Sequence, residues 1–399
     1  MTVLKTRSRA CLALAAAALT ACVAITAYAQ LQIEVTSGVT DPIPIAIVPF
    51  AGGVPADASA GADVANVVEH DLQGSGRFRP MPRAQMRAAP SDAKEVVLPD
   101  WRAAGNDYVV VGRVTALDGG QLGVDFQLLN ALDSEQLASQ RFTAPPSALR
   151  DAAHRVSDVI YQKILGVRGA FATRIAYVAV EGSPPMQHFQ LVVADADGAN
   201  AHVVLDSRQP VMSPAWSPDG RELALTLSGS DGNPEIYTLD LANQQLTRLT
   251  DDPSINTEPT WAPDGRSIYF TSDRGGGPQV YQIGLGPDAR PKRITFEGTY
   301  NARPRISPDG TQLATVSLEQ GGYCIAVEDL ASGTVRVLSH GPLDNAPSFA
   351  PNGAMLIYSS TEHGQVVLKR VSLDGLTSQR LASSEADVRD PVWGPFLHP

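Results

Sequence analysis

Carboxylates recur at a regular interval in the second half of the chain. Asp219, Asp264 and Asp309 each stand between a proline and a glycine, and carboxylates that converge on one site could act as general acids or bases or bind a metal ion. The local sequence favours a simpler role. In a Pro-Asp-Gly turn, proline presets φ, glycine accepts a positive φ, and aspartate bonds nearby backbone N–H groups. Asn352 takes the same place in a fourth copy without a charge, so we interpret these positions as turn residues.

Other candidate chemistry is weaker still. The segment Asp195-Ala196-Asp197-Gly198 starts like a calcium-binding loop but lacks the third ligand and the downstream glutamate, which predicts a turn. The seven histidines are scattered without metal-ligand spacing. The sequence contains no Gly-x-Ser-x-Gly, and the roughly 145 residues ahead of the repeats are too few for an α/β-hydrolase domain. We therefore expect no catalytic centre, metal or cofactor.

The turns belong to a longer repeat. The sequence SPAWSPDG at 213–220 returns as EPTWAPDG, RPRISPDG and APSFAPNG, and a partial copy, DPVWGPF, begins at Asp390. The leading prolines stand 45, 45, 43 and 44 residues apart, at Pro214, Pro259, Pro304, Pro347 and Pro391. Each period holds four short strands, and four strands per 40 to 45 residues are typical of a β-propeller.

The array ends in a first strand that has no continuation. A second-strand pattern without a preceding turn motif stands at the array's start, RIAYV at 174–178. We predict that the C-terminal strand pairs with this strand, which closes the ring and removes two exposed sheet edges. Five landmarks then predict five blades in a propeller over 174–399.

The N-terminus predicts export. Residues 1–29 combine a basic start, an apolar run and Ala27-Tyr28-Ala29, which is typical of a secretory signal with its cleavage site. An alternative is the lipobox-like Leu19-Thr20-Ala21-Cys22, which would leave a lipid-anchored Cys22. Loss of three basic residues with the leader takes the formal charge from −11 to −14, which argues against nucleic acid or an anionic membrane as partner. Cys324 then remains as the only cysteine, and its strand position predicts a buried thiol.

Residues 30–166 predict a small α/β domain with a mixed sheet. Strand patterns cover 43–50, 108–114, 122–128 and 137–143, one helix lies around 64–72, and a second runs from an N-cap at Ser147 to a stop at Gly166. Residues 166–173 would be the hinge into the propeller. The preceding segment at 30–40, QLQIEVTSGVT, has two interpretations: an edge strand of the small domain, or a detachable strand that pairs with another protein's sheet.

The ordered series IEVTSGVTDPIPIAIVPF, GAFATRIAYV, SPAWSPDG, NTEPTWAPDG and APNGAMLIYSS resembles the TolB family of the Tol-Pal system of Gram-negative bacteria, over essentially the whole chain after the leader. The resemblance implies a periplasmic, non-enzymatic protein that helps to keep the outer membrane attached and invaginating during division. It also implies binding of the lipoprotein Pal at the propeller and of inner-membrane TolA at the N-terminal segment, here Gln32, Ile33, Glu34 and Val35. We expect a monomer that is peripheral to membranes.

The chain departs from the family in one respect. The family propeller has six blades, whereas five repeats are countable here, so the ring either closes with five blades or is incomplete. Either outcome changes the curvature of the mouth and thereby puts the Pal site in question.

Partner contacts are expected at one mouth of the channel. The loops that join a fourth strand to the next first strand gather there, and rigid blades hold them in place. These loops carry the predicted partner-binding residues, which are Asn256, Thr257, Glu258, Asn301, Arg303, Asp344, Asn345, Arg389 and Asp390. Unchanged Pal affinity after charge reversal at Glu258 would contradict this location.

Two other classes of protein are possible alternatives. Related repeats occur in propellers that gate peptidases, but the nucleophile motif is missing. An exported propeller could also bind a small ligand or glycan, and would then carry aromatic residues at its mouth. Trp216 and Trp261 repeat at one strand position and are more simply explained as core residues.

Overall fold

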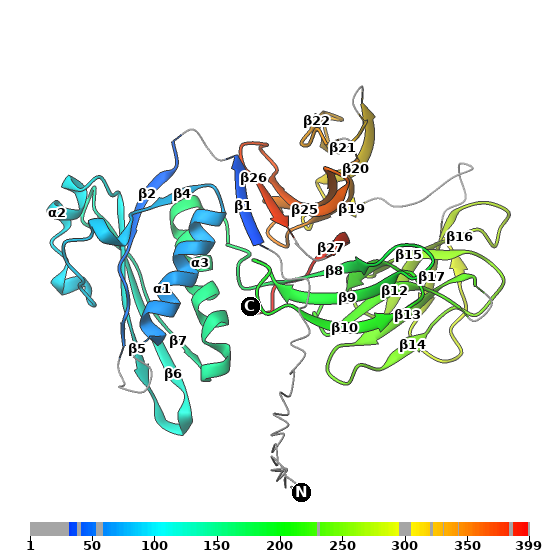
Figure 1. Cartoon of the computed structure of the whole chain (residues 1–399), viewed down its shortest axis with the longest axis horizontal. Coiled ribbons are helices and arrows are strands. Elements are labelled where there is room, and N and C mark those ends of the chain that lie inside the picture. Colours follow the sequence, from blue (N-terminus) through cyan, green and yellow to red (C-terminus); the bar gives the residue numbers. More distant parts are fainter. Residues whose placement is uncertain are drawn as a thin grey trace, which may run out of the picture.

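The computed structural model describes residues 32–37, 41–52, 59–229, 232–294, 305–319, 322–329, 331–341, 343–382 and 386–397. Residues 1–29, the predicted leader with Cys22, lie outside these ranges. The chain forms an α/β domain and a propeller that lie side by side (Figure 1). Within the described residues, no helix has both the length and the apolar character needed to span a membrane.

The α/β domain is built on a mixed sheet, as predicted. Its strand order is β4-β2-β5-β6-β7, with β3 also paired to β5. β2 runs parallel to β4 and β5, whereas β5, β6 and β7 form an antiparallel meander. The bounds are β2 (Ile43–Ile47), β3 (Ala51–Gly52), β4 (Phe78–Pro80), β5 (Tyr108–Ala116), β6 (Leu122–Asn130) and β7 (Gln136–Ala144).

Two helices cover one face of this sheet. α1 (Ala60–Gly74) and α3 (Leu149–Leu165) bury their apolar stripes, including Val64, Val68 and Ile160, against it. The short α2 (Leu98–Ala103) places Trp101 on the other face. In Figure 1, α1 and α3 lie on the side of the sheet that faces the propeller.

The predicted start of the second helix is wrong by one residue. Residues Pro146–Ala148 form a 3₁₀ turn, and α3 has its N-cap at Ala148, which makes no side-chain cap bond. Pro145 and Pro146 fix the backbone here and leave Ser147 inside the turn. The predicted stop is confirmed, since Gly166 closes α3 with φ 78°, a left-handed conformation that glycine adopts without strain.

In the described residues, the propeller contains five sheets, which we call blades 1 to 5; each has four strands of the repeat, and one sheet gains a fifth strand from the N-terminal segment. Blade 1 is β27 (Asp387–Trp393), β8 (Arg174–Glu181), β9 (His188–Asp195) and β10 (His202–Ser207). Blade 2 is β11 (Val211–Trp216), β12 (Glu222–Ser228), β13 (Pro234–Asp240) and β14 (Leu246–Arg248). Blade 3 is β15 (Asn256–Trp261), β16 (Ser267–Ser272), β17 (Gln279–Gly284) and β18 (Lys292–Arg293). Blade 4 is β19 (Arg305–Ile306), β20 (Gln312–Glu319), β21 (Gly322–Asp329) and β22 (Val335–Val337). Blade 5 is β23 (Asn345–Phe349), β24 (Met355–Glu362), β25 (Gln365–Ser372) and β26 (Ser378–Ala382).

Blade 1 is composite, as the sequence predicted. β27 pairs antiparallel with β8, and Trp393 lies opposite Ile175. The other sequence-derived roles in the repeats are also confirmed. Asp219 and Asp309 accept backbone N–H groups of their own turns, and Cys324 is buried in β21.

The N-terminal segment does not join the small domain, which corrects one of its two interpretations. β1 (Gln32–Ser37) pairs antiparallel with β26 and becomes the fifth strand of blade 5. The sheet of the α/β domain ends at β4 and β7 instead. A strand that alternates apolar and polar residues fits any open edge, so its sequence alone did not select between the two sheets.

Blades 3 and 4 are not packed together as the other neighbours are. Apolar clusters join blades 5 and 1, 1 and 2, 2 and 3, and 4 and 5, and in the described part of the chain none joins 3 to 4. Ile306 of blade 4 is 56% exposed, whereas Trp216 and Trp261 at the equivalent positions are 8% and 7% exposed. Near the channel, Arg305 Nη1 donates to Thr260 Oγ1 at 3.1 Å. The ring is therefore incompletely packed at this seam.

Candidate partner-binding surfaces

A repeated kink marks the first strand of the blades. Ser213, Glu258, Ala346 and Asp390 each precede the proline of a first strand and have φ between 49° and 61°. The pairing register of β11, β15, β23 and β27 shifts at the same place. Residues other than glycine rarely adopt a backbone conformation with positive φ, and such backbone strain is concentrated at functional sites. The kinks bring the mouth residues of neighbouring blades together: Asp390 Oδ2 accepts the backbone N–H of Ser213 at 3.1 Å.

A cavity of about 740 Å³ opens at this mouth. Four of the predicted partner-binding residues line it. Asp344 and Asn345 stand at the start of blade 5, and Arg389 and Asp390 lie in β27 of blade 1. The lining includes exposed apolar side chains that the sequence analysis missed, namely Val316, Tyr323 and Leu343. Nothing in the repeat pattern distinguishes these side chains from core positions, because their exposure follows from the arrangement of the blades.

The predicted residues of blade 3 lie apart from this cavity. Asn256 is fully buried, where its amide donates to Glu235 Oε2 at 3.0 Å and its Oδ1 accepts from Arg274 at 2.7 Å. Glu258 Oε2 accepts from Thr271 Oγ1 at 3.0 Å. Thr257 is half-buried in β15. Asn301 and Arg303 lie outside the described residues.

The mouth residues differ in what they offer to a partner. Asp344 is 1% exposed and accepts the backbone N–H of Gly341 at 2.9 Å, so it braces its own loop. Asn345 is exposed. Arg389 is half-buried, and its Nε has no hydrogen-bond partner among the residues that the structure describes. Among the described residues that line this cavity, Arg389 is also the only cation, which suits it to an acidic partner group.

The second predicted surface, the N-terminal segment, is occupied by the protein itself. Gln32, Ile33, Glu34 and Val35 pair in register with Ala382, Leu381, Arg380 and Gln379. A strand held at a sheet edge by backbone bonds is of the kind that can exchange to another protein's sheet.

A buried ion network joins the two domains on the side away from the mouth. His154 Nδ1 of α3 lies 2.8 Å from Asp71 Oδ2 of α1, and Ser157 Oγ donates to the same oxygen at 2.6 Å. Arg150 pairs with Asp195 at 3.4 Å and also with Asp197, both in blade 1. The carboxylates that the sequence assigned to a turn are therefore domain contacts as well.

The surroundings shift the pKa values of two groups in and beside this network. Burial disfavours the His154 cation, but Asp71 and Asp197 outweigh it and raise the pKa of His154 to about 9. Burial raises the pKa of Asp158 to about 7, against the backbone N–H of Phe171 that its carboxylate accepts at 2.7 Å. Asp71, His154 and Asp197 are close enough for one metal ion. Arg150 also pairs with Asp197, so a cation of this chain already faces that carboxylate.

An α/β domain followed by a propeller with a composite blade, a polar mouth and an N-terminal strand on one blade defines a two-domain propeller protein. The family models agree: residues 31–137 match the TolB amino-terminal domain, and residues 161–228 and 214–397 match the TolB beta propeller domain. The chain belongs to the TolB family. TolB is a non-enzymatic component of the Tol-Pal system.

The relatives cover nearly the whole chain. The Tol-Pal system protein TolB of Thioalkalivibrio sulfidiphilus is 46% identical over 415 aligned positions, which include 93% of this chain and 95% of the relative. That of Xylella fastidiosa strain M12 is 45% identical over 421 positions, with 94% and 95% coverage. The crystal structure of TolB from Acinetobacter baumannii has a TM-score of 0.67 at 35% identity, covering 92% of this chain and 100% of that one.

The alignment lengths give the size of the segment that this chain lacks. Of 399 residues, 93% is about 371, so about 44 of the 415 positions aligned with the Thioalkalivibrio protein have no residue here. That number equals one repeat of 43 to 45 residues. The five blades and the unpacked seam between blades 3 and 4 are therefore consistent with the loss of one whole blade.

Proposed function

We propose that the protein is a periplasmic scaffold of the Tol-Pal system that binds the lipoprotein Pal at the propeller mouth and TolA through its N-terminal segment. In this role it supports outer-membrane integrity and constriction during cell division. The observation that carries the proposal is the mouth cavity, in which Asn345, Arg389 and Asp390 accompany the exposed Tyr323 and Leu343. Polar groups around an apolar centre are typical of a protein-binding surface.

A propeller of five blades still has this surface. Residues of blades 1, 2, 4 and 5 line the cavity. An apolar cluster joins blade 1 to blade 2, and another joins blade 4 to blade 5. The seam between blades 3 and 4 lies beside it. The proposal therefore places the Pal contact on the mouth residues of blades 1 and 5, with Arg389 as the charged anchor.

The test is Pal binding to immobilised protein, measured for Arg389→Glu. Charge reversal of an anchor at the centre of a site is expected to weaken binding by about tenfold or more. Arg266→Glu is the matched control, because Arg266 is exposed in a Pro-Asp-Gly turn at the opposite end of blade 3. Equal Pal affinity of the two variants would contradict the mouth site, and no binding of Pal to the unaltered protein would contradict the function.

The TolA contact is tested separately. Deletion of residues 32–37 should abolish binding of TolA and leave binding of Pal, since β1 lies on blade 5's outer edge and contributes nothing to the mouth cavity's described lining. Retained TolA binding by the shortened protein would show that TolA uses another surface.

A further inference from the structure

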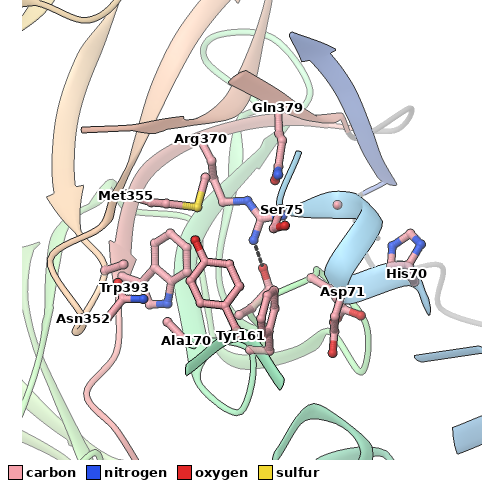
Figure 2. A pocket seen from close by; sticks show the side chains of 15 residues that line it. His70, Asp71, Ser75, Tyr161, Ala170, Asn352, Met355, Arg370, Gln379 and Trp393 are labelled. Carbon is pink, nitrogen blue, oxygen red and sulfur yellow. Dashed lines mark hydrogen bonds between the residues drawn. The ribbon is translucent and has the colours of Figure 1, made fainter. Parts of the chain in front are cut away.

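A small pocket lies where the α/β domain meets blades 1 and 5 (Figure 2). Ser75 and Tyr161 line it from the α/β domain, and Arg370, Gln379 and Trp393 line it from the propeller. The cavity measures about 30 Å³, which is room for roughly two water-sized groups. Figure 2 shows Arg370, Gln379, Ser75 and Tyr161 around this space, whereas His70 lies away from it.

Two deeply buried side chains in this pocket have unused hydrogen-bonding atoms. Arg370 is 6% exposed, and Gln379 is 1% exposed. Arg370 Nη1 donates to the carbonyl oxygen of Ala196 at 2.9 Å, but its Nε has no partner in the described part of the chain. The amide nitrogen and oxygen of Gln379 also have no partner there. A buried polar atom left unpaired is destabilising, so this pocket favours a ligand that pairs these atoms.

Other polar groups at the pocket are already satisfied. Trp393 Nε1 donates to Thr173 Oγ1 at 2.9 Å, and Ser75 Oγ donates to the carbonyl oxygen of Leu72 at 2.6 Å. Asn352 donates to the carbonyl oxygen of Arg168 at 2.9 Å and accepts from Ala354 at 3.0 Å. The unmet capacity is therefore that of Arg370 and Gln379.

We propose that this pocket binds a carboxamide group. One carbonyl oxygen has two lone pairs, which accept the N–H of Arg370 Nε and an N–H of Gln379 Nε2. The ligand's own N–H donates to Gln379 Oε1. The carbonyl oxygen and the amide nitrogen are the two water-sized groups for which the cavity has room, and Met355 and Trp393 provide an apolar wall for the attached carbon.

A carboxylate fits this pocket less well than a neutral amide. It has no hydrogen to donate, so Gln379 Oε1 would stay unpaired. It would also add a third carboxylate to Asp71 and Asp197, which line the same pocket. Burial lowers the pKa of Arg370 to about 10, and a carbonyl acceptor on Nε relieves part of that cost without adding charge.

The pocket is coupled to the N-terminal strand. Gln379 lies in β26, directly opposite Val35 of β1 in the pairing register. Ser75 and Tyr161 belong to the other domain. A carboxamide bound to Gln379 therefore holds a side chain of the strand on which β1 is docked, and its binding should slow the exchange of amide hydrogens in β1 and β26.

The test uses the full-length mature protein with acetamide and, for comparison, acetate. A crystal soaked in acetamide should show its carbonyl oxygen within hydrogen-bond distance of Arg370 Nε and Gln379 Nε2. Acetamide should also raise the melting temperature in a saturable way, because a ligand that binds the folded state stabilises it by mass action. Acetate should need a concentration about tenfold higher for the same effect, equal to about 1.4 kcal/mol.

Gln379→Leu keeps the size of the side chain and removes both unpaired atoms, so it should abolish the saturable response. Gln209→Leu is the control, since Gln209 is exposed in the loop between β10 and β11 and does not line this pocket. Ordered waters in place of acetamide at every concentration, or equal binding of acetate, would overturn the proposal. If Gln379→Leu does not fold, the comparison of acetamide with acetate on the unaltered protein still decides.

Discussion

Trp216 Nε1 donates to the carbonyl oxygen of Val392 at 3.2 Å, although the two residues stand 176 positions apart. The same contact recurs one blade later, where Trp261 Nε1 donates to the carbonyl oxygen of Ala215 at 3.1 Å. Each tryptophan thus fastens its blade to the residue that precedes the equivalent aromatic position in the blade before. Blade 4 has Ile306 there, which carries no donor, and its seam with blade 3 is the one that is unpacked.

Removing a fastening tryptophan should therefore cost far more than removing its counterpart at the seam. Trp261→Ala deletes a buried indole and its hydrogen bond, so we expect a loss of about 3–5 kcal/mol in the free energy of unfolding. Ile306→Ala should cost well under about 1 kcal/mol, because Ile306 is mostly exposed. Denaturant unfolding of both variants checks this. Equal losses would mean that blades 3 and 4 pack together in solution.

Closure by the C-terminal strand gives a second prediction. Removal of the last ten residues, 390–399, deletes Trp393 and the end of β27 that lies opposite Ile175 and Ala176. Blade 1 then loses its first strand beyond Arg389, and its core with blade 5 is uncovered. The melting temperature should fall for the whole propeller in one transition, as differential scanning calorimetry would record. An unchanged melting temperature would contradict the closure.

Stability should fall as the pH rises from about 6.5 to 9. The pKa of His154 is raised to about 9 in the folded protein from an ordinary 6.5, so its contribution is complete below pH 6.5 and disappears as the pH passes 9. The pKa of Asp158 is raised from 3.8 to about 7, so this group also makes stability fall with rising pH, but over a lower range: its contribution is lost as the pH rises from 3.8 through 7. The pKa of Asp195 is also raised. The pKa of Asp197 is lowered, so its contribution to stability has the opposite sign and is lost only under acid conditions.

The matched experiment is a pH series of unfolding free energies for the unaltered protein and His154→Gln. The variant should lose the decline between pH 6.5 and 9 and keep the one below pH 7 that Asp158 causes. A decline of the same size in both proteins would assign the effect to other groups.

Breaking the ion network at its carboxylate should be costly at neutral pH. Asp71 is 4% exposed and pairs with His154 and Ser157. Asp71→Ala leaves the buried imidazolium without its nearest counter-charge, for which we expect a loss of about 3–5 kcal/mol. Asp63→Ala, on the exposed face of the same helix, should change stability by less than about 0.5 kcal/mol. Equal small effects would show that His154 is uncharged in the folded protein.

The sequence predicted those features that depend on local chemistry. The Pro-Asp-Gly turns, the strand alternation and the unfinished last repeat follow from backbone preferences within a few residues, and the pairing of β27 with β8 follows from the two incomplete patterns. Features that depend on distant contacts could not be predicted. The strand that accepts β1, the role of Asp195 and Asp197 at the domain junction and the gathering of Tyr323 with Leu343 are set by how blades and domains pack. At the mouth, the predicted ring of polar residues divides into those of one cavity and those of blade 3.

The docked N-terminal strand gives the last prediction. β1 satisfies the outer edge of β26 through residues 32–37, and an uncovered edge strand opens more readily to solvent. Deletion of 32–37 should therefore speed amide hydrogen exchange in β26 and leave it unchanged in β14 and β22, the outer strands of blades 2 and 4. A milder change is Val35→Pro, which removes one backbone donor from the pairing, and its control is Val35→Thr. Hydrogen exchange measured by mass spectrometry separates the outcomes: if β26 is equally protected with and without β1, the strand is not docked in solution, and its release cannot be what exposes it to TolA.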